Sequence, residues 1–76
     1  MAHDPSALYV PESHRASRVL WRRVVAAHKA RVASGAGEYG IGYATGFRDG
    51  ISEAYSAITG VTRQAVGQRA RAEAEQ

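Results

Sequence analysis

The chain has 76 residues, no cysteine, ten lysines and arginines against seven acidic residues, and a formal charge of +3, so it can hold one domain and cannot use disulfides. Its three histidines, His3, His14 and His28, are spaced too widely for a familiar metal site, and we expect no metal and no cofactor. A domain of this size buries only a modest core. Self-association is the remaining source of stability, so we expect a homo-oligomer.

Residues 1–11 hold both prolines around a short alternating stretch, which predicts an extended N-terminal arm. The first residues show no basic segment followed by an apolar one, so no secretory signal is expected. No uncharged apolar stretch approaches the ~20 residues that cross a bilayer. We therefore expect a cytoplasmic protein that has no membrane partner.

Residues 12–33 contain neither glycine nor proline and predict the first helix. At about 100° per residue, one broad side of this helix is apolar and includes Trp21, whereas the opposite side carries a narrow strip of cations. We call this strip the basic stripe; it consists of Arg15, Arg18, Arg22 and Lys29. It is either an ordinary solvated helix face or a surface for nucleic-acid phosphates.

Residues 38–59 predict a second helix, although each internal glycine costs roughly 1 kcal/mol against alanine. Two rows with a spacing of four residues indicate the helix. The aromatic row is Tyr39, Tyr43, Phe47, Ile51 and Tyr55, and the glycine row is Gly42, Gly46, Gly50 and Ala54. The short link at 34–37 between the two helices predicts that they are antiparallel neighbours, which gives a helical hairpin over residues 12–60.

The two rows allow more than one arrangement. Small residues let another backbone approach closely, and that backbone belongs either to the first helix or to a second protein. The aromatic row is either core or an exposed anchor surface. A hairpin has only one other helix to cover this row, so we expect part of it to meet a further element. The predicted protein interface comprises Gly42, Gly46, Gly50, Tyr39, Tyr43, Phe47, Tyr55 and Trp21.

Gly60 punctuates the end of the second helix, and Thr62 is a suitable N-cap for a short third helix within residues 61–76. Because the apolar residues of this segment are mostly alanine, we expect a short C-terminal helix or a frayed tail that orders when it docks. The predicted fold is thus all-α: an antiparallel hairpin with an extended N-terminal arm and a short C-terminal helix, completed by oligomerisation.

Enzymatic chemistry has little support in the sequence. Asp49 and Glu53 lie one helical turn apart, but no nucleophile with a base and no phosphate-binding loop accompany them. We expect Arg48, Asp49 and Glu53 to serve solubility or a salt bridge to the first helix, and we expect no catalytic residues.

The segment from Tyr39 to Gly50, with the pattern GY-x-x-GF-x-DG, resembles small uncharacterised proteins of actinobacterial bacteriophages and their hosts. The resemblance implies a phage accessory protein in the host cytoplasm or in the particle, and it carries no site residues. We expect a non-enzymatic protein–protein interaction module that acts on a host protein or self-assembles through a glycine and aromatic helical face.

The alternative function is a small nucleic-acid-binding regulator that uses the basic stripe. A helix-turn-helix would need the glycine-rich helix for recognition, and that helix offers Arg48 and few other base-reading side chains. A ribbon-helix-helix would need polar residues on its strand, and the arm has Leu8 and Val10. Nucleic acid is therefore the second choice of partner.

Overall fold

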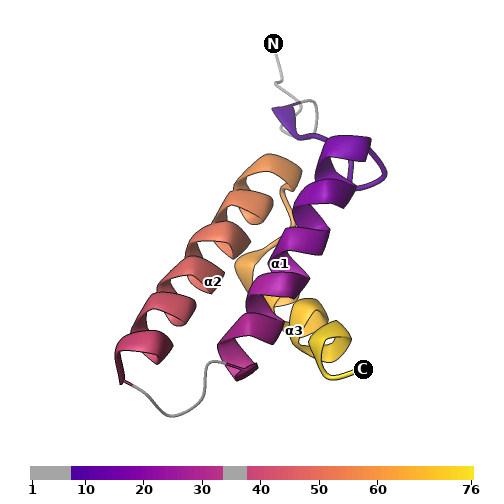
Figure 1. Ribbon diagram of the computed structural model, residues 1–76. Coiled ribbons are helices and arrows are strands. Elements are labelled where there is room, and N and C mark those ends of the chain that lie inside the picture. The colour runs from indigo at the N-terminus through magenta and orange to yellow at the C-terminus, as the bar shows by residue number, and fades with distance from the viewer. Residues whose placement is uncertain (1–7, 34–37) are drawn as a thin grey trace.

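The computed structural model contains three α-helices within the residues it describes, 8–33 and 38–76. They are α1 at Arg15–Ala33, α2 at Glu38–Thr59 and α3 at Arg63–Ala74 (Figure 1). No strand occurs in these two ranges, so the predicted all-α class is confirmed. Residues 1–7 of the predicted arm and the predicted link at 34–37 lie outside the described residues, as do the side chains of residues 38–41.

The start of α1 differs from the predicted start at Glu12. Residues 11–14 form a turn in which the His14 amide donates to the Pro11 carbonyl oxygen at 3.0 Å. The Nδ1 atom of His14 then accepts a hydrogen bond from the Ala16 amide at 3.1 Å, which satisfies one of the amides that a helix start leaves unpaired. The helix therefore begins at Arg15, and Glu12 stays outside it.

The described part of the arm lies against the C-terminal end of α2. The Val10 amide donates to the Ile58 carbonyl oxygen at 2.9 Å. Gly60 ends α2 with a φ of +78°, a conformation that favours glycine, and its amide donates to Ser56 at 2.9 Å. A Cβ atom at Gly60 would lie 2.7 Å from the Tyr9 ring, so the ring occupies the space that only glycine leaves open.

Helices α1 and α2 lie side by side and run in opposite directions, and α3 contacts both (Figure 1). Thr62 caps α3 by accepting a hydrogen bond from the Ala65 amide at 3.2 Å, as predicted. The C-terminal segment is docked in this structure, since Val66 and Ala70 of α3 are completely buried. The small alanine side chains of α3 are sufficient to dock it because α3 packs against both other helices.

The core is small. The buried cluster consists of Val24, Tyr55, Val66 and Ala70, with Leu20, Trp21, Ile51 and Val61 packed partly buried around it. Several large apolar side chains of the described residues remain on the surface. None of the three helices is both long enough and apolar enough to span a bilayer.

Candidate functional site

The aromatic row of α2 divides between the surface and the core. Tyr43 and Phe47 are 73% and 54% exposed, Ile51 is half-buried, and Tyr55 is only 2% exposed. Four residues advance a helix by about 400°, so each step of the row turns it by about 40° around the axis. The row therefore passes from the outer side of α2 into the core. The Tyr39 side chain, predicted for the same interface, lies outside the described part.

The glycine row stays on the outer side of α2. Gly42, Gly46 and Gly50 are exposed, and a Cβ atom built at any of them would meet nothing within 4 Å. Close approach of α1 to this row, one of the two arrangements allowed by the sequence, is therefore wrong. Helix α1 instead contacts α2 on the side where Tyr55 is buried.

These exposed residues form a continuous, uncharged surface, which we call the α2 outer face. Its members share the side of α2 that points away from the core, and all are exposed: Gly42, Tyr43, Gly46, Phe47, Gly50, Ala54, Ala57 and Ile58. Of the charged residues in the described part of α2, Arg48 and Asp49 lie elsewhere on the helix, whereas the exposed Glu53 borders the face beside Gly50 and Ala57. Arg63 of α3 reaches Asp49 and Glu53 at 4.0 and 3.6 Å. The expected salt bridge to the first helix is thus made to α3.

Trp21 and Tyr55, predicted as interface residues, are joined in the core instead. Their ring centroids are 5.1 Å apart at an interplanar angle of 55°. The guanidinium carbon of Arg69 lies 4.7 Å from the centroid of the Trp21 ring, and the Trp21 Nε1 donates to Glu73 at 2.7 Å. Both latter residues belong to α3, so the third helix covers the aromatic residues that a hairpin would leave open.

A polar cluster that the sequence did not reveal ties the turn before α1 to α2 and α3. The Tyr55 hydroxyl and the Arg69 guanidinium both donate to Oε1 of Glu12, at 2.7 and 2.8 Å. The hydrogen bonds from Arg69 and then Tyr55 lower the pKa of Glu12. Burial and the hydrogen bond to Glu12 raise the pKa of Tyr55 to about 12. The cluster joins residues 43 and 57 positions apart, a separation at which no sequence period signals contact.

The basic stripe lies on the exposed side of α1, opposite the core. None of its four cations has a hydrogen-bond or ion-pair partner among the described residues. Arg18 and Arg22 line a surface cavity of about 580 Å³, together with Arg69 and the acidic Glu12 and Glu73. The fold thus adds a third guanidinium, that of Arg69, to the two that the stripe places in this cavity, and it brings two carboxylates beside them.

Comparison with known protein families, curated proteins and solved structures found no match to this chain. Among the described residues no group of three or more His, Cys, Asp or Glu side chains is arranged to hold a metal ion. Two surfaces of the described residues are distinctive: the exposed, mainly apolar α2 outer face, and the arginine-lined surfaces of α1 and α3.

Proposed function

We propose that this chain is a non-enzymatic protein–protein interaction module that self-associates through the α2 outer face. The observation that carries the proposal is the exposure of Gly42, Gly46 and Gly50 beside Tyr43 and Phe47. Exposed aromatic side chains next to a strip without side chains form a surface of anchors and holes. Such a surface is complementary to itself.

The cost of the glycines supports this proposal. Three glycines inside one helix destabilise it by about 3 kcal/mol relative to alanine. No described side chain fills the space above them, so the monomer recovers none of this energy through contacts. A second helix lying on the strip approaches closer than the usual ~8–10 Å between helix axes and gains dispersion contacts in return.

Because the face carries both aromatic side chains and a strip of glycines, it is complementary to a second copy of itself, and this favours a second copy as the occupant. In a twofold, antiparallel pairing of two α2 helices, Phe47 of one protomer lies over Gly46 and Gly50 of the other, and the reverse contact is made at the same time. Glu53 borders the face beside Gly50 and Ala57, and its carboxylate lies 3.6 Å from the Arg63 guanidinium, which offsets its charge when two copies meet. A host protein with a similar apolar helix is the other occupant compatible with this surface.

The size of the face sets the expected affinity. The face runs from Gly42 to Ile58, about 25 Å of helix that is about 10 Å wide, which gives roughly 250 Å² of projected area per protomer. Standard interfaces bury about 800 Å² per partner. We therefore expect a weak dimer whose population depends on concentration.

Light scattering after size exclusion, over concentrations from about 1 mM to 1 µM, tests the proposal across the expected range of binding energies. The wild type should shift from dimer to monomer on dilution. Gly46→Leu, which fills the strip, should be monomeric throughout. Ala26→Leu places the same side chain on the exposed side of α1 and should dimerise like the wild type. A wild-type mass that stays monomeric at every concentration would refute self-association.

The basic stripe supports a second candidate function, nucleic-acid binding. Its four cations have no ion-pair partner among the described residues, and two of them share a cavity with Arg69 of α3 and with the carboxylates of Glu12 and Glu73. Fluorescence anisotropy with duplex DNA should then show binding that weakens with salt. Each phosphate contact contributes about −0.9 to the logarithmic slope, so Arg18→Ala with Arg22→Ala should reduce the slope by about 2. Binding that is absent at low salt would remove this candidate.

A further inference from the structure

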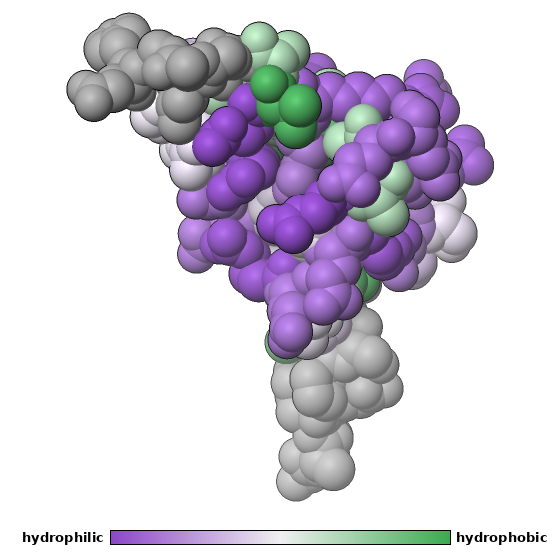
Figure 2. All heavy atoms as spheres, turned by 90° about the horizontal axis from the view of Figure 1, so that it is seen from below, coloured by the Kyte–Doolittle hydropathy of each residue, from purple (hydrophilic) through white to green (hydrophobic). Residues whose placement is uncertain are grey.

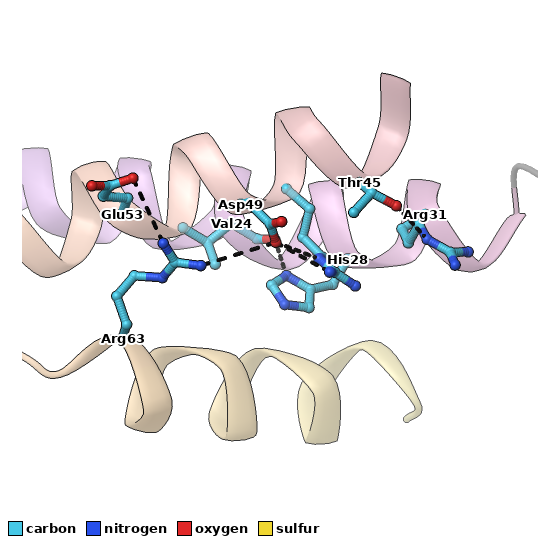
Figure 3. A network of polar contacts seen from close by, with 8 residues as sticks. Val24, His28, Arg31, Thr45, Asp49, Glu53 and Arg63 are labelled. Carbon is cyan, nitrogen blue, oxygen red and sulfur yellow. Dashed lines mark hydrogen bonds and ion pairs between the residues drawn. The ribbon is translucent and has the colours of Figure 1, made fainter. Parts of the chain in front are cut away.

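A second cavity lies where the three helices meet, on a different side from the basic stripe. Its volume is about 180 Å³, well above the roughly 10–15 Å³ that a cavity needs to hold one water. Each helix contributes to its walls: His28 from α1; Arg48, Asp49 and Ser52 from α2; and Arg63, Gly67 and Arg71 from α3. In Figure 3, Arg63 extends from α3 toward Asp49 and Glu53 of α2, with His28 of α1 nearby. An adjoining cavity shares His28, Arg48 and Arg71 and adds the charged residues Arg31 and Glu75.

Positive charge predominates in this three-helix cavity. Three guanidinium groups line it against one carboxylate, that of Asp49. Arg48 and Arg63 both contact the same oxygen of Asp49, at 3.1 and 4.0 Å, and Arg63 also pairs with Glu53 at 3.6 Å. Since a guanidinium has five N–H donors, both keep donors for a further ligand. The Arg71 guanidinium has no hydrogen-bond or ion-pair partner among the described residues. The end of the molecule where α1 finishes is mainly hydrophilic (Figure 2).

The unpaired hydroxyl of Ser52 indicates a ligand in this cavity independently of the arginines. Ser52 is only 4% exposed, it lines the cavity, and its hydroxyl oxygen has no hydrogen-bond partner. Buried polar side chains are nearly always paired, so an unpaired hydroxyl at a cavity wall indicates a missing acceptor or donor. His28 bonds through Nδ1 to the Val24 carbonyl oxygen at 2.9 Å. The carbonyl can only accept, so the proton is on Nδ1 and the Nε2 atom is left for another contact.

We propose that the three-helix cavity binds a phosphate-class oxyanion. Arg48, Arg63 and Arg71 supply guanidinium donors from two helices, and the Ser52 hydroxyl supplies a neutral donor from the cavity wall. A tetrahedral anion fits this set because its oxygens point in several directions, whereas a planar carboxylate is satisfied by one guanidinium fork. The surplus of positive charge excludes a metal cation as the ligand. The site is separate from the α2 outer face, so it stands or falls independently of self-association.

An NMR titration of the full chain with inorganic phosphate at constant ionic strength tests the proposal. The amide signals of Ser52 and Gly67 and the side-chain Nε–H of Arg71 should shift and saturate together. Arg71→Ala should weaken the apparent affinity about tenfold, because it removes hydrogen bonds between charged groups. Arg71 is exposed and unpaired, so this variant should fold normally. Arg15→Ala removes an exposed arginine from the basic stripe and should bind phosphate like the wild type.

The titration results that support the phosphate site differ from those that overturn it. Saturable shifts at the cavity that weaken in Arg71→Ala and persist in Arg15→Ala support the site. Shifts that rise linearly with phosphate, or an affinity unchanged by Arg71→Ala, overturn it. Sodium acetate at the same ionic strength is the test of ligand class. If acetate saturates the same signals with equal affinity, the assignment to phosphate-class anions is wrong.

Discussion

Replacement of Gly46 by alanine separates the stability of the monomer from its association. The added Cβ would meet nothing within 4 Å, so it introduces no clash in the monomer. An exposed glycine-to-alanine change inside a helix gains about 1 kcal/mol, because glycine loses more backbone freedom on folding. For a domain of 60–100 residues this raises the Tm by about 4–8 °C. Extending the change to Gly42 and Gly50 should bring the gain to about 3 kcal/mol.

The same substitutions should weaken the dimer. Helix propensity is gained equally by the folded monomer and the folded dimer, so it cannot change the dissociation constant by itself. The dissociation constant responds only to the contact across the strip, where three methyl groups hold the partner helix away. We expect thermal unfolding at high dilution to show a more stable monomer, and light scattering at high concentration to show several-fold weaker association.

Gly67→Ala is the matched control for this experiment. Gly67 lies in α3, away from the α2 outer face, and a Cβ atom there also meets nothing within 4 Å. It should raise stability by a similar ~1 kcal/mol and leave association unchanged. A dilute Gly46→Ala protein that is less stable than the wild type would show that the strip is occupied within the monomer. Unchanged association in the triple alanine variant and in Gly46→Leu would refute the role of this face.

Three further predictions concern the contacts that hold the arm and the helix ends. The pKa of Glu12 is lowered by Arg69 and Tyr55, so its stabilising contribution is fully present above the ordinary value of 4.5 and is lost as the pH falls through the lower folded value. Glu12→Gln should lower the free energy of unfolding by about 1 kcal/mol at neutral pH, a moderate amount because solvent screens this exposed pair. In urea unfolding curves measured at several pH values, the variant should also lose less stability in acid than the wild type. The pKa of Tyr55 is raised to about 12, so its contribution is fully present below its ordinary value of 10.0 and is lost as the pH rises through about 12. A spectrophotometric titration should show one tyrosine of the four ionising late, and Tyr55→Phe should remove that step, whereas four coincident steps would contradict the buried hydroxyl. Gly60→Ala should destabilise the fold by about 1–2 kcal/mol, because an L-residue is disfavoured at positive φ and its Cβ would clash with the Tyr9 ring; calorimetry that finds an unchanged Tm would exclude this tight turn.

The sequence alone determined the local features of this protein. The stretch without glycine or proline, the spacing of the two rows and the cap at Thr62 depend on helix geometry within a few residues, so they predicted α2 with its observed bounds and the start of α3. The turn at Gly60 followed from the same local chemistry. The predicted start of α1 was less accurate, because residues 11–14 form a separate turn and the His14 side chain accepts the hydrogen bond of the Ala16 amide at the helix start.

The tertiary structure decided which surface each row faces. A spacing of four residues identifies a helical row but also turns it gradually around the axis, so only the position of α3 and α1 determines that Tyr43 is exposed and Tyr55 buried. The cluster of Glu12, Tyr55 and Arg69 and the cavity at Ser52 join residues far apart along the chain. Contacts of this kind depend on how whole helices pack against each other, and no local periodicity encodes them.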